Sequence, residues 1–567
     1  MTRRARILSW SVVVCALVAF LYTSSRFCAK ATYFLDDPYI SMRYAANLAE
    51  HGELSFNPGE RVEGYSNFLH VLLEAAVFRT SGIPNAVVAE DEGTYLVFAA
   101  AVLQLVVLGK LARRAAGHEA ESAAWYYAWI LTAASWPFAF WATAGLETPI
   151  EGLLYAGIVA ATTAMGRGAR ARTAWVLVAG LLVGVTLLRF EGVLVAFAAT
   201  GAIGWHLWTT GRRREAGSLA AAVVVPSGAY HLWRLVYFGH LLPNTFVAKA
   251  TGGSAWHRLA SGASYGGQWL AFTCGAVGMV ALGIGATLSR ERLRFSLAKV
   301  AEDPVALVAA AIVVAKVLLV VWGGGDWMPG WRMLVPVSPL ALFLVFRALF
   351  AALDLRVDLR ANGLPALALG LALLLCSRPS EAYFADHNGI PDETGLLKKV
   401  PRGYVSMGDT LERVFKPASL REPGSDNPLA SSRGMFGGGA GEVAIGEAGL
   451  IPFEARHVRF MDLMGLVDED MARQPGAMHE KVHASHVVER APVAVVFAHL
   501  NFRPPYGPYQ YGAELLGSAA FHAAYRRVEL DDDITLLGWA LYVRRDIDAP
   551  GLGLVWSRSD PFALLGH

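Results

Sequence analysis

Residues 304–322, PVALVAAAIVVAKVLLVVW, contain one charged residue, Lys316. A helix needs about 20 predominantly apolar residues to cross a bilayer, so this stretch predicts a transmembrane helix. The whole chain has 567 residues, of which 54% are hydrophobic and 17% charged, and its mean hydropathy is +0.39. A soluble globular chain carries about 25% charged residues. The composition therefore places most of the chain in lipid and excludes a disordered, collagen-like or coiled-coil protein.

Apolar stretches of similar length recur along the chain and predict a multi-pass α-helical membrane protein. The first, 7–23, follows Arg3, Arg4 and Arg6, and basic flanks stay in the cytoplasm. Basic clusters then alternate with loops that lack them, which predicts about eleven crossings with a cytoplasmic N-terminus. The other stretches lie at about 94–112, 123–142, 146–165, 173–188, 192–210, 217–237, 266–288, 304–322, 330–350 and 362–377.

Two N-terminal segments allow a second interpretation. A cleaved signal peptide ending near Ala29–Ala31 is the alternative for the first stretch. Residues 67–80 are apolar but short and contain Glu74, and the alternation of basic loops leaves no room for another crossing there. We therefore expect 67–80 to form an interfacial or re-entrant helix.

Charged residues are concentrated at the C-terminal end. Residues 378–567 hold 44 of the 96 Asp, Glu, Lys and Arg residues, about 23% of that stretch against about 14% of 1–377. We predict a transmembrane domain over 1–377, with its first outer loop at 28–66, and an extracytoplasmic α/β domain over 378–567. The net charge of +2 without a long basic run predicts no nucleic-acid partner, and four cysteines are too few for a disulfide scaffold.

The C-terminal domain carries its own pattern of strands and helices. Residues 443–445 and 492–497 are predicted as buried strands, 528–530 with 535–544 as a hairpin, and 480–489 as a helix. The domain either steers an acceptor or caps the membrane domain. His479 to His483 match the H-E-x-x-H zinc-protease motif, but the flanks are polar and no third ligand is evident, so we expect a structural or acceptor-facing role.

Five predicted outer loops carry polar clusters, and ionisable groups near membrane depth are expensive and usually functional. The alternative is that pairs such as Arg189 and Glu191 only brace turns. Lys316, Glu151 and Arg234 also lie at membrane depth. In chain order the clusters contain Asp36, Asp37, Arg43, Glu63, Tyr65 and Asn67; Glu147; Arg189 and Glu191; Asn244 and Lys249; and Asp326, Trp327 and Arg332.

These residue types suit sugar transfer from a lipid phosphate. An external carboxylate can act as a general base toward an acceptor hydroxyl. Arginine and lysine can hold the phosphate leaving group and offset its developing charge. Aromatic rings can stack on sugar faces. An Asp-Asp pair directly after the first transmembrane helix, with basic groups on other outer loops, is a stronger signal than the pair alone.

The sequence resembles a known family in several segments. DDPYISMRYAANLAEHGELSFNPGERVEGYSNFL (36–69) is similar to the first outer loop of polyprenyl-phosphate-dependent glycosyltransferases of the GT-C superfamily, especially the mycobacterial terminal β-(1→2) arabinofuranosyltransferases and their bacterial homologues. Matching patterns follow in order: AGLETPIE (144–151), LLRFEG (187–192), WRLVYFGHLLPNTFVAK (233–249), GGDWMPGWRMLVPVSPL (324–340), GEAGLIPF (446–453) and MDLMGLVDEDMAR (461–473).

The resemblance implies a GT-C fold and a bacterial plasma-membrane enzyme facing the periplasm. It also implies a polyprenyl-phosphate-linked donor of arabinofuranose or a hexose, and a cell-envelope glycan as acceptor. The family carries its base on the first-loop Asp pair; we expect Asp36 to be the base, with Asp37 positioning the acceptor or sharing a metal. The pair with Glu147 or Asp326 could bind Mg²⁺ or Mn²⁺, although lipid-phosphate donors do not require one.

The remaining polar residues are assigned by charge and location. Arg189, Lys249 and Arg332 are expected at the donor phosphate. The expected sugar- or acceptor-contacting residues are Arg43, Glu63, Tyr65, Asn67, Glu147, Glu191, Asn244, Asp326 and Trp327.

Two alternatives to the enzyme stay open. One is a non-catalytic envelope or motility assembly factor on the same fold. The other is a lipid or sugar transporter, although no internal repeat supports a transporter.

Overall fold

The chain folds into two compact units, which are described separately. The first comprises 1–30, 92–233 and 254–383, and the second comprises 31–91, 234–253 and 384–567. The first outer loop thus belongs to the same unit as the C-terminal region, whereas the division at residue 377 stays a prediction. The computed structural model describes residues 14, 16–25, 36–114, 119–165, 169–250, 254–287, 303–326, 328–353, 400–416, 441–476, 481–498, 510–530 and 539–558.

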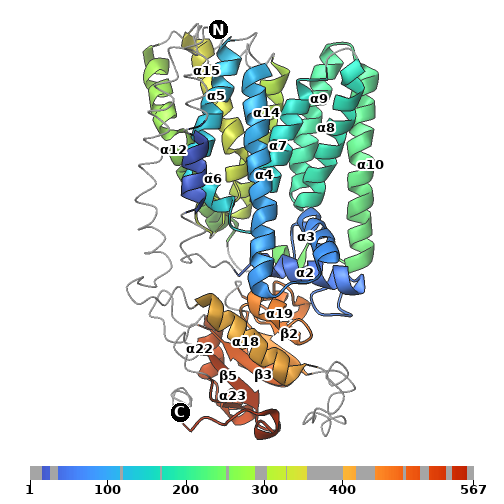
Figure 1. Cartoon of the computed structure of the whole chain (residues 1–567), viewed down its shortest axis with the longest axis vertical. Coiled ribbons are helices and arrows are strands. Elements are labelled where there is room, and N and C mark those ends of the chain that lie inside the picture. Colours follow the sequence, from blue (N-terminus) through green and yellow to red (C-terminus); the bar gives the residue numbers. More distant parts are fainter. Residues whose placement is uncertain are drawn as a thin grey trace. The chain divides into compact units, whose positions relative to one another are not determined.

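The first unit is helical, and Figure 1 shows its long helices side by side. Neighbouring pairs include α7 with α8, α8 with α9, α9 with α14, and α5 with α15. Its elements are α4 (Ala86–Arg114), α5 (Glu119–Ala134), α6 (Trp136–Trp141), α7 (Thr148–Thr162), α8 (Ala169–Leu188), α9 (Gly192–Thr209), α10 (Arg213–Phe238), α12 (Ala255–Thr287), α14 (Pro304–Gly323), η2 (Val335–Val337) and α15 (Ser338–Leu353). Of these, α4 belongs to this unit from Glu92 onward and α10 as far as Trp233, and their other residues belong to the second unit.

This is a multi-pass membrane protein. Within the described residues, five helices are long and apolar enough to cross a bilayer: Asp91–Arg113, Ala171–Leu188, Gly192–Thr209, Arg213–Phe238 and Pro304–Gly323. Shorter apolar helices cover Ala16–Ser25 and Val335–Ala351. The predicted span at 362–377 and the segment near Ala29–Ala31 lie outside the described residues. The cytoplasmic N-terminus stays a prediction.

Packing between these helices follows from residue size. Trp125 of α5 stacks on Phe343 of α15 with ring centroids 3.8 Å apart. Gly262 of α12 lies against the backbone of Val321 in α14, where any side chain would collide. The predicted single helix over 123–142 is divided between α5 and α6, because Ser135 is extended and Pro137 follows it in the first turn of α6.

The second unit is built around a five-stranded mixed sheet of order β2-β1-β3-β5-β4. Three strands are parallel and two are antiparallel to their neighbours: β1 pairs in parallel with β2 and β3, β3 pairs antiparallel with β5, and β5 with β4. The strands are β1 (Glu442–Ile445), β2 (Arg459–Asp462), β3 (Ala494–Phe497), β4 (Tyr525–Arg527) and β5 (Ala540–Arg544).

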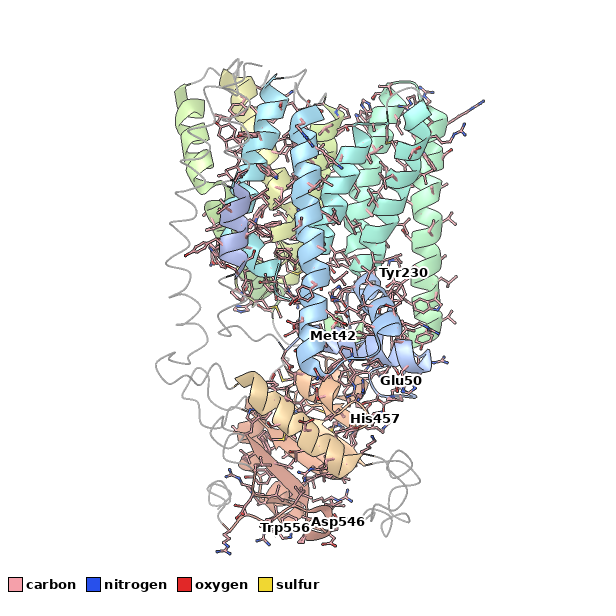
Figure 2. The ribbon with its side chains drawn as sticks, in the orientation of Figure 1. Met42, Glu50, Tyr230, His457, Asp546 and Trp556 are labelled. Carbon is pink, nitrogen blue, oxygen red and sulfur yellow. The ribbon has the colours of Figure 1, made fainter. Side chains whose placement is uncertain are left out.

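Helices from three parts of the chain complete this unit. Residues 31–91 supply α2 (Pro38–His51) and α3 (Phe68–Ser81), and 234–253 supplies α11 (Asn244–Ala250). On α2, Met42 is buried whereas Glu50 near the helix end is exposed (Figure 2). The C-terminal elements are α18 (Val400–Phe415), α19 (Leu450–Glu454), α20 (Glu469–Ala472), α21 (Ala484–Arg490), α22 (Gln510–Leu516), α23 (Ala519–Ala524) and η6 (Pro550–Leu552).

Most sequence predictions for this region are confirmed. The predicted strands at 443–445 and 492–497 are β1 and β3, and the late hairpin is the β4–β5 pair, with β4 three residues earlier than expected. The predicted helix at 67–80 is α3, whereas its position at the membrane surface stays a prediction. The predicted helix at 480–489 begins only at Ala484, because His483 has an extended backbone.

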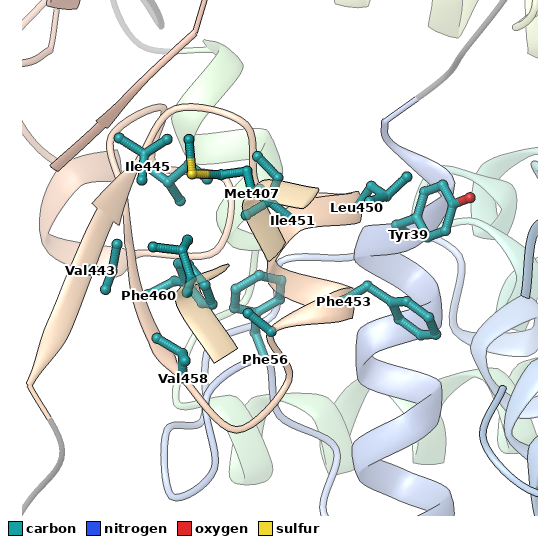
Figure 3. Packing of buried hydrophobic residues seen from close by; sticks show 14 of the residues in the cluster. Tyr39, Phe56, Met407, Val443, Ile445, Leu450, Ile451, Phe453, Val458 and Phe460 are labelled. Atoms are coloured by element: carbon teal, nitrogen blue, oxygen red, sulfur yellow. The ribbon is translucent and has the colours of Figure 1, made fainter. Parts of the chain in front are cut away.

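The first loop and the C-terminal sheet share one hydrophobic core. Tyr39 and Phe56 from the loop lie in the same buried cluster as Val443, Ile445 and Phe460 from the strands, and Figure 3 shows them in close packing. The ring of Tyr39 lies 5.6 Å from that of Phe453 in α19. Burial of apolar surface therefore holds together segments about 400 residues apart in the chain.

Polar contacts fix the register of the loop on the sheet. Asn57 donates from Nδ2 to the carbonyl of Phe460 (2.8 Å) and accepts at Oδ1 from the N–H of Phe460 (3.0 Å). This side-chain amide occupies the hydrogen-bonding groups of the edge strand β2 as a further strand would. Glu60 forms an ion pair with Arg459 next to it.

Arg43 of α2 is the most heavily bonded group in this contact. Its side chain is fully buried and donates from Nε to the carbonyl of Phe56 (2.8 Å) and from Nη2 to that of Val458 (2.8 Å). Its Nη1 donates to the carbonyls of Pro452 and Ala455. These bonds give Arg43 a structural role; its predicted contact with substrate stays a prediction.

Replacement of Arg43 by methionine should destabilise the second unit by at least about 3 kcal/mol, because several buried carbonyls lose a charged donor. Thermal unfolding of the purified full chain, followed by the fluorescence of buried tryptophans, measures the loss. Arg61→Met is the control, since Arg61 is exposed and lies over the Tyr237 ring at 4.8 Å. Equal unfolding temperatures for the two variants would contradict the structural role.

Candidate functional site

The predicted outer-loop clusters come together in two groups, one in each unit. The second, third and fifth clusters, which contain Glu147, Arg189 with Glu191, and Asp326 with Arg332, lie in the first unit. The first and fourth clusters lie in the second unit with the C-terminal sheet. That all five clusters converge on one mouth, as their shared side of the membrane suggests, stays a prediction.

In the first unit, a buried ion-pair network joins α7, the turn between α8 and α9, and α14. Arg189 contacts Glu147, which precedes α7, and its Nε lies 2.5 Å from Oε1 of Glu191. Lys316 of α14 lies 2.6 Å from Oε1 of Glu151 and 3.5 Å from Oε1 of Glu191. All of these side chains are buried except Glu191, which is partly exposed.

Tyr155 completes the network by donating from its hydroxyl to Oε1 of Glu151 at 2.6 Å. Three carboxylates thus surround two cations, Arg189 and Lys316. A buried charge needs a partner of opposite sign, and each cation here has two. The network explains why charged residues occur in apolar segments of the sequence. Arg189 contacts two carboxylates here, and its predicted contact with the donor phosphate stays a prediction.

The fifth cluster forms a separate pair in the same unit. Nε of Arg332 lies 2.7 Å from Oδ2 of Asp326. Tyr265 of α12 accepts a hydrogen bond from the N–H of Met333 (3.3 Å) and lies within electrostatic reach of Asp326, Arg332 and Arg189. Trp331 has a positive φ of 50°, which is rare for a bulky residue. Trp327 lies outside the described residues.

In the second unit, Glu63 and Arg234 form a buried two-point ion pair. Nε of Arg234 donates to Oε1 of Glu63 at 2.7 Å, and Nη2 donates to Oε2. The pair joins the first predicted cluster to the fourth. A bidentate arginine–carboxylate pair fixes both the position and the orientation of its two side chains. Glu63 therefore holds the C-terminal end of α10 against the first loop.

Three other predicted sugar-contacting residues are also buried. Asn244 donates from Nδ2 to the carbonyls of Gly465, Leu466 and Asp468, between 2.9 and 3.2 Å. Asn67 accepts from the hydroxyl of Ser41 at 3.0 Å. Tyr65 packs edge-on against Tyr44 with centroids 4.9 Å apart. These contacts stabilise the loop itself.

Asp36 and Asp37 directly precede α2 and are both half-buried. Oδ1 of Asp36 accepts the N–H of Leu450 and Oδ2 accepts that of Gly449, both at 2.8 Å. Asp37 is the residue before α2, and its side chain makes no capping hydrogen bond to that helix. Lys249 is exposed near the end of α11 and makes no ion pair with any residue that the structure describes.

A residue that the sequence did not single out, Asp462, lies at the end of β2. Its carboxylate accepts the N–H groups of Met464, Leu466 and Val467 at 2.6 to 2.9 Å and is fully buried. Asp462 shapes the turn that Asn244 binds. The signal for Asp462 in the sequence is that its segment, MDLMGLVDEDMAR, belongs to the patterns that carry the family resemblance.

Burial raises the pKa of the carboxyl groups of Asp36 and Asp462. For Asp36, loss of solvent raises the pKa from 3.8 to about 7 against the lowering effect of the Leu450 N–H, and the charge of Asp37 raises it further. For Asp462, burial also raises the pKa to about 7, although the N–H of Val467 opposes this. A carboxyl group with such a pKa can exchange a proton near neutral pH.

The metal hypotheses gain no support from the described part of the chain. There, no group of three or more His, Cys, Asp and Glu side chains is arranged to hold a metal ion. His479 and Glu480 of the H-E-x-x-H motif lie outside the described residues, and His483 precedes α21 instead of lying within it.

Comparison with solved structures finds proteins of similar architecture. The archaeal oligosaccharyltransferase AglB from Archaeoglobus fulgidus, in complex with an inhibitory peptide and a dolichol-phosphate, is 12% identical with a TM-score of 0.50, covering 100% of this chain and 78% of that one. The chain has a GT-C-like fold. The fold predicted from the sequence, a helical membrane protein with a C-terminal domain of mixed sheet, is confirmed.

Other comparisons are weaker. ArnT from Cupriavidus metallidurans in the apo state is 15% identical with a TM-score of 0.49, covering 94% of this chain and 96% of that one. The same protein bound to undecaprenyl phosphate is 14% identical with a TM-score of 0.46, covering 86% and 92%. A domain of unknown function (DUF8728) matches residues 438–542. No curated protein sequence matches the chain.

Lys316→Met should destabilise the first unit by about 3–5 kcal/mol, because Glu151 loses its buried cation. The double variant Lys316→Met with Glu151→Gln should recover part of this loss, since it removes a buried charge of each sign. Thermal unfolding of the four proteins in detergent gives the coupling energy. Additive effects of the two substitutions would contradict the network.

The raised pKa values predict a pH dependence of stability for the second unit. Because folded Asp36 and Asp462 bind protons more tightly than the unfolded chain, their contribution is fully present below about pH 4 and is lost as the pH rises to about 7. Asp462→Asn should flatten this decline in unfolding temperature. Asp546→Asn, on an exposed residue, is the control and should leave the slope unchanged.

Proposed function

We propose that the protein is a membrane glycosyltransferase. It moves a sugar, arabinofuranose or a hexose, from a polyprenyl-phosphate donor to a cell-envelope glycan on the outer face of a bacterial plasma membrane. The observation that carries the proposal is a GT-C-like fold whose first loop presents an Asp pair in one compact unit with the exposed Lys249. The AglB structure supports the donor class, since that protein is in complex with a dolichol-phosphate.

The proposed reaction is a displacement at the anomeric carbon. The acceptor hydroxyl oxygen forms a bond to this carbon, the bond to the phosphate oxygen breaks, and polyprenyl phosphate leaves with the electron pair. Asp36 takes the hydroxyl proton. Each of its oxygens accepts one backbone N–H, and an ionised carboxylate has about four lone-pair positions, so room for the proton remains. Asp37 beside it orients the acceptor.

The three predicted phosphate-binding cations differ in their contacts with carboxylates. Arg189 is held by two glutamates and Arg332 by Asp326. Lys249 is exposed and belongs to the same unit as Asp36. We therefore assign Lys249 to the donor phosphate, where its charge offsets that of the leaving group. Arg189 and Arg332 hold the helices and loops around them.

Sugar transfer in proteoliposomes tests the proposal. Labelled polyprenyl-phosphoryl arabinose, mannose and glucose are each supplied with envelope glycan as acceptor. Asp36→Asn should lower kcat by about 100-fold or more through loss of the base, whereas Lys249→Met should chiefly raise the KM for the donor. Asp470→Asn and Lys110→Met are the controls, because both residues are exposed.

Two results would count against the enzyme. Consumption of none of the donors would contradict the reaction for those sugars and favour the non-catalytic assembly factor. Transfer that Asp36→Asn and Asp37→Asn both leave unchanged would refute the assignment of the base to the first-loop pair while keeping the enzyme.

A further inference from the structure

We infer that Gly449, in the loop after β1 of the C-terminal sheet, and Leu450, the first residue of α19, are positioning residues for Asp36. The inference rests on the proposed function for its catalytic meaning, but the contact itself is independent of any reaction. It makes the C-terminal sheet part of the machinery that orients the base, where the sequence left open an acceptor-binding or a capping role.

The hydrogen bonds fix the carboxylate at both ends. Gly449 N–H donates to Oδ2 and Leu450 N–H to Oδ1, each at 2.8 Å. Two bonds from successive backbone groups define the plane of the carboxylate, since rotation about its axis would break both. Bonds from N–H groups to a charged acceptor are stronger than neutral ones. Asp36 is therefore held in one orientation by a segment 413 residues away.

The backbone approaches too closely for any residue but glycine at position 449. A Cβ atom there would collide with the backbone oxygen, Cγ and Oδ2 of Asp36. These atoms cannot move aside cheaply, because Asp36 lies one residue before the N-cap of α2, which Arg43 ties to the carbonyls of Pro452 and Val458. The short distance to Asp36 is thus a reason of its own for glycine at position 449.

The position of this loop in the sheet supports the same role. β1 lies between β2 and β3, and all three run parallel. The chain leaves β1 toward β2 on one side and later returns to β3 on the other, so the carboxyl end of β1 is where the strand order reverses. Open α/β sheets commonly bind ligands at such a point. Here the loop at that point binds the side chain of Asp36.

Hydrogen exchange on the full chain tests the contact without an activity assay. Asp36→Ala should raise exchange at the Gly449 and Leu450 amides about tenfold, which corresponds to about 1.4 kcal/mol per lost hydrogen bond. Asp37→Ala is the matched control and should leave these amides protected. Unchanged protection in Asp36→Ala would overturn the inference whether or not the protein is an enzyme.

Kinetics of Gly449→Ala then test the positioning role. Gly441→Ala is the matched control, because a Cβ there collides with Val493 at the other end of β1 and does not touch Asp36. Gly449→Ala should lower kcat at least tenfold below Gly441→Ala with the donor KM within twofold, because Lys249 is unaffected. Hydrogen exchange can show the contact between Asp36 and Leu450 while Gly449→Ala and Gly441→Ala have equal kcat. That result would refute the positioning role and leave the proposed function standing.

If Gly449→Ala does not fold, Leu450→Pro replaces it, with Leu450→Ala as control. Both substitutions shorten the buried side chain, but only proline removes the N–H that Oδ1 of Asp36 accepts. Leu450 is the first residue of α19, where proline is compatible with a helix. A lower kcat for Leu450→Pro than for Leu450→Ala supports positioning, and equal values oppose it.

Discussion

The second unit depends on the burial of Arg43. A guanidinium removed from water must have its N–H groups satisfied, and here the carbonyls of Phe56, Pro452, Ala455 and Val458 satisfy them. One of these carbonyls belongs to the first loop and three belong to the C-terminal region. Neither segment can supply this set alone, so the loop that carries the Asp pair and the sheet fold together.

Other contacts across the same boundary follow this constraint. Asn57 covers the edge of β2, Asn244 binds the turn shaped by Asp462, and the loop after β1 holds Asp36. In the first unit the charges are instead used among the helices, where Lys316 and Arg189 neutralise buried glutamates. The two units thus use polar residues differently: the first unit uses them to join helices to one another, and the second uses them to orient a loop against the sheet.

The helical membrane architecture could be predicted from the sequence, because a long apolar run in lipid must satisfy its backbone hydrogen bonds internally, as a helix does. The strands at β1 and β3 were also predictable, since each is a short apolar run. Partners of individual residues were not. Lys316 was recognised as costly at membrane depth, but its partner Glu151 is 165 residues away, and only the packing of α7 on α14 shows that they meet.

The candidate site shows the same limit more clearly. Asp36 was selected by its position after the first helix, yet nothing local indicates that Gly449 and Leu450 bind it. The one signal was that GEAGLIPF and MDLMGLVDEDMAR resembled family signatures without an assigned role. The structure gives each a role: the first holds Asp36, and the second forms the turn bound by Asn244. Glu63, expected at the sugar, forms a buried ion pair with Arg234, a partner that the sequence does not indicate.

The contacts of Arg43 and Asn57 make the first loop and the C-terminal sheet one folding unit. Native-state hydrogen exchange of the full chain in increasing denaturant tests this directly, because it gives the opening free energy of each segment. We expect amides in 43–57 and in 443–462 to open together with the same free energy. Opening of the loop at a clearly lower free energy, with the sheet still protected, would contradict it.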